Sequence, residues 1–235
     1  MRGGGKGLRA RVAGCVCLCL LAGAARGVEA ASPNGTASAI ADVNANATDE
    51  PLSADARYAA QWIVDADDHR GLPFAIVDKK AARLFVFGPR GRLVGAAPAL
   101  VGSASGDHAT PGTGQLEPAR IPLAERTTPA GRFASEPGRN LGGEAVVWVD
   151  YAAGLAIHRV RPGAAEAQRE QRLASATPDD NRASLGCIVV MPAFYDGVVT
   201  PWLGAGRGVV YVLPESRPVA EMFGAAAPRV SMLLP

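Results

Sequence analysis

Short apolar runs, separated by glycine, proline and polar turns, recur through the middle of the chain. Runs of about 4–8 residues rich in Val, Ile, Leu and Phe are typical of β-strands. The segment Tyr151-Ala-Ala-Gly154 lies between two such runs and predicts a hairpin turn. A further extended segment begins at Arg132-Phe133. The complete strands predicted in this way are residues 74–78, 83–87, 92–96, 146–150, 155–160, 186–191 and 208–213.

Helical periodicity is limited to three short segments. Residues 55–66 place Tyr58 and Trp62 at helical spacing after a capping residue, Ser53 or Asp55. The other two segments are residues 164–173 and 194–199. The expected fold is therefore mainly β with a few short helices.

The predicted elements fill one domain, over residues 55–214, with a tail at 215–235. Inside this domain, residues 102–126 are rich in Gly, Ser and Pro and contain few apolar side chains. Loops of this length are often functional or mobile. We therefore expect this loop to be functional or mobile.

The first 30 residues have the three-part pattern of a secretory signal peptide. Basic residues among glycines come first, an uncharged apolar run at 12–25 follows, and small residues come next. The run is shorter than the ~20 residues that a membrane span needs, although an uncleaved anchor remains the alternative. Residues 31–54, rich in Ala, Ser, Asn and Thr, predict a disordered linker. The protein is expected to be exported to the periplasm or cell envelope.

Composition excludes several classes of function. The formal net charge is +2, but residues 1–30 hold five basic side chains and one acidic one. The rest of the chain has 19 basic and 21 acidic side chains, so it lacks the basic surface that nucleic acid requires. Aromatic residues, at 6%, are too few for a base-stacking platform. No run after Pro51 is long and apolar enough to span a membrane.

Cysteine usage narrows the search for chemistry. Three of the four cysteines lie in the predicted signal peptide, which leaves Cys187 alone in the exported chain. A single thiol in an oxidising compartment is a nucleophile, an intermolecular bridge or a small buried hydrophobe. Cys187 follows Gly186 where a loop meets a predicted strand, and backbone amides at such a turn can stabilise an oxyanion.

Of the three histidines, His158 is the candidate base. It lies inside an apolar strand, where an imidazole needs a hydrogen-bonding partner, either a backbone carbonyl or a nearby nucleophile. A thiol becomes a good nucleophile when an imidazole takes its proton, and Ser184 has a hydroxyl that can orient that imidazole. His69 is expected in a solvated turn and His108 on the surface of the long loop.

Three motifs in order resemble the L,D-transpeptidases with a YkuD-like catalytic domain. They are Thr127-Thr-Pro-Ala-Gly-Arg-Phe133, the strand ending at Ile157-His158, and Ser184-Leu-Gly-Cys187. The resemblance covers residues 72–214. It implies a β-sandwich or barrel-like domain that acts on peptidoglycan stem peptides without a metal or organic cofactor.

The resemblance also implies the residue roles. The Cys187 thiolate attacks the carbonyl at the L-centre of a diamino acid, D-alanine leaves, and an amine, water or a free D-amino acid resolves the thioester. His158 is then the base, Ser184 orients it, and the amides of Gly186 and Cys187 form the oxyanion hole.

The chain departs from the family pattern at several positions. Leu185 and Val189 stand where polar residues are usual, and Arg159 stands where Gly is usual. The interval between His158 and Cys187 is long, and its extra residues, 163–180, are a candidate lid.

Two arginines are the candidate substrate contacts. Arg182 can hold a stem-peptide carboxylate bidentately, or pair with Asp179 or Asp180 at the surface. Arg159 is the second candidate, next to the proposed base.

Other classes of function remain open. The variant motif also fits a wall-binding or scaffold protein with a degenerate site. A thiol redox protein would need a second thiol from outside the chain. A glycosidase would need two carboxylates across a cleft, which the sequence does not place.

Overall fold

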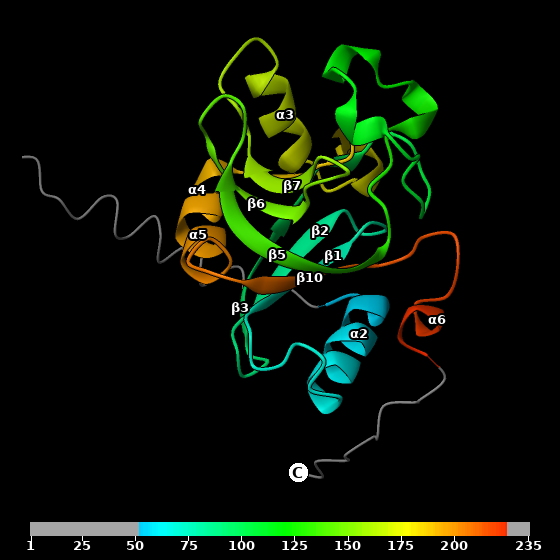
Figure 1. Ribbon diagram of the computed structural model, residues 1–235, viewed down its shortest axis with the longest axis vertical. Helices are drawn as coiled ribbons and strands as arrows, with labels where there is room; N and C mark the ends of the chain where they lie inside the picture. Colours follow the sequence, from blue (N-terminus) through cyan, green and yellow to red (C-terminus); the bar gives the residue numbers. More distant parts are fainter. Residues whose placement is uncertain (1–51, 225–235) are drawn as a thin grey trace, which may run out of the picture. The chain divides into compact units, whose positions relative to one another are not determined.

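The computed structural model describes residues 52–224 (Figure 1). The predicted signal peptide at 1–30, nearly all of the predicted linker at 31–54, and residues 225–235 lie outside the described residues. Within 52–224, no helix combines the length and apolar character that a membrane crossing requires.

One eight-stranded sheet forms the domain, with strand order β3-β2-β1-β10-β5-β6-β7-β9. Most neighbouring strands are antiparallel, but β1 pairs with β10 and β7 with β9 in parallel. A separate parallel pair joins β4 (Val101–Gly102) to β8 (Arg182–Ser184). The strands of the large sheet are β1 (Phe74–Asp78), β2 (Arg83–Phe87), β3 (Leu93–Pro98), β5 (Gly131–Arg139), β6 (Ala145–Asp150), β7 (Leu155–Arg159), β9 (Ile188–Val190) and β10 (Gly208–Val212).

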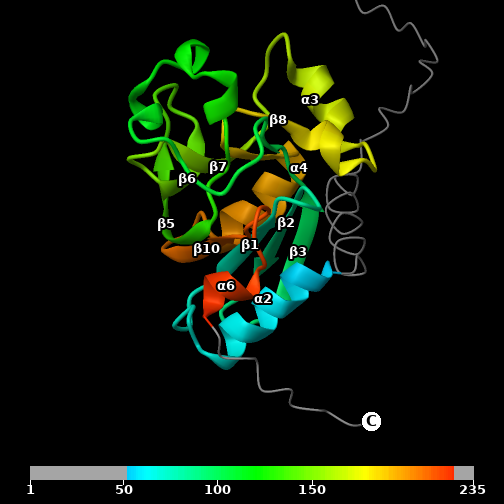
Figure 2. The same cartoon turned by 90° about the vertical axis from the view of Figure 1, so that its right-hand side faces the viewer.

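Two helices cover one face of the sheet. Helix α2 (Ala54–Asp65) begins at Ser53, whose Oγ accepts a hydrogen bond from the Ala56 amide at 3.0 Å. Helix α6 (Ala220–Phe223) lies beside α2 in both views (Figures 1 and 2). Their apolar side chains pack on alternate residues of β1, β2 and β10 and form one core cluster. Because α6 belongs to this core, the domain extends past the predicted boundary at residue 214.

The opposite face holds a larger core. It unites buried residues of β1–β3 with those of β6, β7 and β9, so the two halves of the sheet share one interior. A continuous helical segment closes it and consists of α4 (Pro192–Phe194), the π-helical η5 (Tyr195–Val199) and α5 (Thr200–Trp202).

The end of the domain opposite α2 carries the irregular segments (Figure 2). Helix α3 (Glu166–Leu173) buries Leu173 against Leu100, Val160 and Val189. The long loop before β5 contains three 3-10 turns, η1 (Thr113–Gln115), η2 (Pro118–Arg120) and η3 (Leu123–Glu125), and η4 (Pro178–Asn181) precedes β8. These segments stand over the ends of β6 and β7.

The expectation of a mainly β fold with a few short helices is confirmed. Every predicted strand is present, within about two residues at most ends, and the predicted hairpin turn lies at 151–154. The short strands β4 and β8, helix α6 and the 3-10 turns went unpredicted, because segments of two to four residues are too short to show a pattern.

Candidate functional site

A pocket of about 740 Å³ in the described part of the chain contains both His158 and Cys187. Its walls come from β6, β7, the long loop, α3 and the segment that joins β8 to β9. The remaining motif residues Ser184, Leu185 and Gly186 also line it. The fold therefore brings the sequence-predicted nucleophile and base into one cavity.

Strand pairing explains why these two side chains share a face. Strands β7 and β9 are parallel neighbours, and their register pairs Ile157 with Ile188 and His158 with Val189. Ile157 and Ile188 both point into the core. Because side chains alternate along a strand, His158 and Val189 point to the other side, and Cys187, two residues before Val189, points there as well. That side is the pocket.

The Cys187 thiol is a protonated group in the free protein. Its Sγ lies 3.4 Å from the Gly154 carbonyl oxygen, to which the S–H donates. Burial raises the pKa of the thiol, against a smaller opposite effect of a backbone hydrogen bond from Ala156. The side chain is neither a disulfide partner nor fully enclosed. A base must therefore remove its proton during attack.

His158 is a neutral imidazole that can act as that base. Its Nδ1 lies 2.8 Å from the backbone carbonyl of Arg159. A carbonyl only accepts hydrogen bonds, so Nδ1 carries the proton and Nε2 keeps its lone pair. Burial, with the nearby Arg161 and Arg169, outweighs the opposite effects of the Arg159 carbonyl and Glu144 and lowers the pKa of His158 to about 4. The imidazole is thus deprotonated and oriented before any substrate binds.

Ser184 has a different contact from the one expected. Its Oγ accepts a hydrogen bond from the Gly186 amide at 3.0 Å, inside the turn that leads to Cys187. The Arg159 carbonyl, not Ser184, orients the imidazole. The Gly186 amide is consequently occupied by Ser184, and the expected pair of oxyanion donors is reduced to the amide of Cys187.

Thr128, a buried residue of the Thr127–Phe133 motif, forms hydrogen bonds with the turn that leads to Cys187. The sequence alone assigns it no role. Thr128 Oγ1 donates to the Gly186 carbonyl at 2.7 Å and accepts from the Gly102 amide at 2.8 Å. The backbone carbonyl of Thr128 in turn accepts from Lys79 Nζ at 2.9 Å. The clue in the sequence was the Thr-Thr-Pro motif itself.

Lys79 is the centre of a buried ionic cluster behind the pocket. Its Nζ lies 2.8 Å from Asp107 Oδ1 and 3.5 Å from Glu215 Oε1, and the side chains of Lys79 and Asp107 are fully buried. Burial alone would raise the pKa of Asp107, but hydrogen bonds from Lys79 and Ser216 hold it well below its usual range. The Lys79-Lys80 pair after β1 gave no sequence signal for this cluster, because charged residues in a turn usually face solvent.

Arg182 belongs to the same cluster and is not a pocket residue. Its guanidinium forms an ion pair with Glu215 and donates to the Lys79 carbonyl at 3.2 Å. Both expectations for Arg182, a substrate carboxylate or a surface pair with Asp179 or Asp180, are therefore replaced by a buried structural contact. Its partner Glu215 lies in the predicted tail, which sequence reasoning had placed outside the domain.

Arg159 also faces away from the pocket, because it alternates with His158 along β7. Its guanidinium lies 3.0 Å from Asp196 and stacks on the Tyr195 ring at 4.8 Å. The expectation that this side chain binds substrate is therefore replaced, and only its backbone carbonyl serves the site.

Three other arginines line the pocket instead, and the first, Arg126 in the long loop, donates from Nε to the Ile121 carbonyl at 3.1 Å. Arg161 is held by Glu144 at 2.9 Å. The guanidinium of Arg169, on α3, has no recorded hydrogen bond or ion pair with any residue of 52–224. The segment considered as a candidate lid thus supplies a cationic wall.

Neither of the remaining histidines lines the pocket. His69 is buried, not solvated as expected, because its ring packs on Phe74 and Nδ1 contacts the Leu72 carbonyl at 3.0 Å. His108 is exposed, as expected. No group of three or more His, Cys, Asp or Glu side chains among residues 52–224 is arranged to hold a metal ion.

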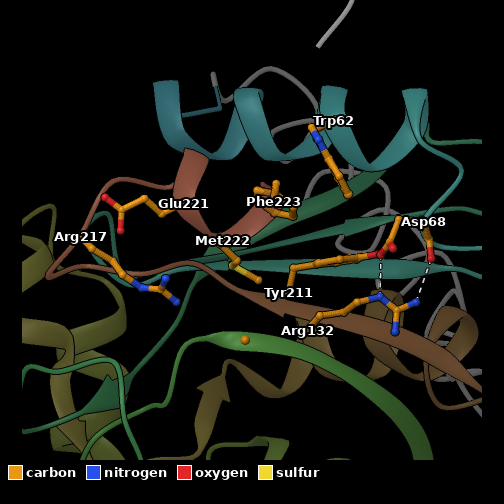
Figure 3. A pocket seen from close by; sticks show the side chains of 9 residues that line it. Trp62, Asp68, Arg132, Tyr211, Arg217, Glu221, Met222 and Phe223 are labelled. Carbon is orange, nitrogen blue, oxygen red and sulfur yellow. Dashed lines mark hydrogen bonds and ion pairs between the residues drawn. The ribbon is translucent and has the colours of Figure 1, made fainter. Parts of the chain in front are cut away.

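A second pocket, of about 290 Å³, lies between α2, α6 and the sheet. In Figure 3 the Arg132 guanidinium and the Tyr211 ring both point at Asp68. Asp68 accepts hydrogen bonds from both, so these three polar side chains are hydrogen-bonded to one another. Arg217 is different, because its Nε is enclosed without a recorded partner in the described part of the chain. Neither a thiol nor an imidazole lines this pocket.

No family model and no curated protein matches the chain. Solved structures that are similar include the helical cell shape determining protein Pgp2 from Campylobacter jejuni, with 15% identity, a TM-score of 0.40 and coverage of 63% of this chain and 49% of that one. The catalytic domain of an E. faecium L,D-transpeptidase has 18% identity, a TM-score of 0.33 and coverage of 60% and 95%.

A third similar structure is a fused Zn-dependent amidase/peptidase/peptidoglycan-binding domain-containing protein from Clostridium acetobutylicum. It has 14% identity, a TM-score of 0.36 and coverage of 77% of this chain and 63% of that one. The chain spans about half the length of the Campylobacter protein. With every TM-score below 0.5, these similarities assign neither a family nor an activity to the chain.

Proposed function

We propose that the protein is an exported cysteine acyltransferase of the L,D-transpeptidase kind that acts on peptidoglycan stem peptides. One observation carries the proposal. The only cysteine of the described chain and a backbone-oriented, neutral histidine lie on the same face of two adjacent parallel strands, inside one pocket of about 740 Å³. That arrangement supports covalent acyl transfer.

The chemistry follows from the protonation states. The Nε2 lone pair of His158 takes the Cys187 proton as Sγ attacks the carbonyl carbon of the substrate, and a tetrahedral oxyanion forms. The imidazolium then returns the proton to the leaving amine, and a thioester remains. An incoming amine attacks this thioester, His158 takes its proton, and the thiol is released.

The pocket wall also supports an anionic substrate. Stem peptides carry free carboxylates, and Arg169 presents a guanidinium without a recorded partner inside residues 52–224. Arginine binds carboxylates with two parallel hydrogen bonds, which fixes their orientation. We assign to Arg169 the carboxylate-binding role that sequence reasoning gave to Arg182 and Arg159.

The deciding experiment is the intact mass of the purified protein after treatment with a carbapenem, compared with Cys187→Ala. We expect one adduct in the wild type and none in the variant. A synthetic tetrapeptide stem then identifies the product as a crosslink, an exchanged D-amino acid or a hydrolysed stem. Unchanged turnover of that stem by Cys187→Ala would overturn the proposal.

A binding protein with a degenerate site is the second candidate. Leu185 and Val189 line the pocket where the family pattern has polar residues, and the thiol pKa is raised. This function predicts an inert thiol in the wild type. It also predicts muropeptide binding that Cys187→Ala leaves unchanged, which calorimetry can measure.

A further inference from the structure

The hydroxyl of Thr128 fixes one peptide unit next to the nucleophile. Thr128 is 2% exposed and is not among the residues that line the pocket. Its single hydroxyl proton goes to the Gly186 carbonyl, while its oxygen accepts from Gly102, so both ends of this contact are defined. The Gly186 carbonyl is therefore anchored toward the interior, away from the pocket.

Because the peptide bond is planar, fixing the Gly186 carbonyl also fixes the direction of the Cys187 N–H. The C=O of Gly186 and the N–H of Cys187 belong to one trans peptide unit and point in opposite directions. With the carbonyl held by Thr128, the Cys187 N–H points away from the interior. No hydrogen-bond partner is recorded for that N–H within residues 52–224.

Backbone geometry shows that this orientation is built into the turn. Gly186 has φ +131°, a value that other residues rarely adopt. A Cβ at this position would lie 2.8 Å from the Thr127 carbonyl oxygen. On the far side, Lys79 Nζ holds the Thr128 carbonyl at 2.9 Å. The turn thus contacts the Thr127-Thr128 segment closely, and that segment is itself fixed.

We propose that Thr128 is a positioning residue that aims the Cys187 N–H at the oxyanion formed during acylation. The inference rests on the proposed acyl transfer at Cys187. It accounts for the contacts of both amides in the turn, since Ser184 occupies the Gly186 N–H and Thr128 directs the Cys187 N–H. Thr128 acts through the backbone and does not touch the substrate.

The test compares two reactions of the same thiol. With p-nitrophenyl acetate, Sγ bonds to the acyl carbon through a tetrahedral oxyanion, p-nitrophenolate leaves, and the thiol proton passes to His158. With iodoacetamide, Sγ bonds to the methylene carbon as iodide leaves, the thiol proton again passes to His158, and no oxyanion forms. Both rates are measured on the full chain, after subtraction of the rates of Cys187→Ala. Neither reagent requires recognition of a stem peptide.

Thr128→Val removes the hydroxyl and keeps the shape of the side chain. We expect its acylation rate to fall about 10- to 100-fold, because a misdirected donor loses most of its effect. Alkylation should stay within about twofold, and Thr128→Ser, which keeps the hydroxyl, should acylate nearly as fast as the wild type. Equal losses in both reactions, or no loss in either, would overturn the inference.

A second variant covers the case in which Thr128→Val does not fold. Gly186→Ala forces the same peptide unit away from the Thr127 carbonyl and should show the same split between the two reactions. If the ester split is found but the stem peptide is not a substrate, the proposed function fails while the role of Thr128 stands. If the stem peptide reacts and the split is missing, only the role of Thr128 fails.

Discussion

The two pockets described above differ in how their charged side chains are paired, although the Nε of Arg217 in the smaller pocket has no recorded partner among residues 52–224. In the pocket between α2 and α6, Asp68, Arg132 and Tyr211 form hydrogen bonds with one another. In the larger pocket, the Nε2 of His158 and the guanidinium of Arg169 have no partner recorded among residues 52–224.

The difference shows what distinguishes a reactive pocket from a structural one. Charged side chains that pair with each other, such as Asp68 and Arg132, are not available to a ligand. Such an ion pair near the surface stabilises the protein by at most about 1 kcal/mol. Groups that keep a free lone pair or proton inside a cavity can act on a ligand. Five measurements test this contrast, beginning with the largest expected effect on acylation.

Replacing the base should have the largest effect. In His158→Gln no side-chain nitrogen can accept the thiol proton, so acylation by the carbapenem should slow by about 10²- to 10⁴-fold. Stopped-flow absorbance measures the rate. His108→Gln, a change at an exposed histidine of the long loop, is the matched control and should react like the wild type. A loss below tenfold in His158→Gln would mean that another group is the base.

The pH dependence of Cys187 alkylation should show that the Cys187 thiol and the His158 imidazole are both neutral in the free protein. Because the thiol pKa is raised, alkylation of Cys187 should increase with pH beyond the range of an ordinary cysteine, about 8.5. A midpoint at or below neutral pH would instead reveal a thiolate–imidazolium pair.

The pH dependence of the free energy of unfolding tests whether the buried His158 imidazole is neutral. The folded-state pKa of His158, about 4, lies below its unfolded value of about 6.5, so the unfolded chain takes up the proton first as the pH falls. The free energy of unfolding should therefore decrease from pH 6.5 to 4. Urea titrations should show a weaker decrease in His158→Gln. Identical slopes in the two proteins would contradict the buried neutral imidazole.

The cationic wall should affect binding more than chemistry. Arg169→Leu removes a guanidinium from the pocket, so the KM for a tetrapeptide stem should increase about tenfold with little change in kcat. Arg172→Leu is the matched control, because Arg172 lies on the same helix and donates to the Asp180 carbonyl. An equal increase in KM in the two variants would mean that a general disturbance of α3, and not the loss of the Arg169 guanidinium, weakens binding.

The second pocket should contribute to stability alone. Asp68→Asn weakens the contacts with Arg132 and Tyr211, and the free energy of unfolding should fall by about 1 kcal/mol. Carbapenem acylation should remain at the wild-type rate. A tenfold slower acylation would show that the two pockets are coupled, and the contrast between them would no longer hold.

The sequence predicts the strands of this domain well because their apolar runs are bounded by clear turns. It also selects Cys187 and His158 as candidate site residues, since a lone cysteine and a histidine inside an apolar strand are unusual, and the structure places both in one pocket. It does not predict the contacts of Ser184, Arg159 or Arg182. Those contacts depend on alternation within β7 and on Glu215, which a local pattern cannot relate to residues far away in the chain.

The ionic cluster behind the pocket has a consequence for the order in which the molecule assembles. Lys79 meets Arg182 across 103 positions of sequence, and Gly106 meets Glu215 across 109. Contacts of such separation form late, because long loops must close first. The turn that carries the thiol is therefore fixed only after nearly the whole domain has folded, and partly folded chains should display Cys187 without its oriented amide.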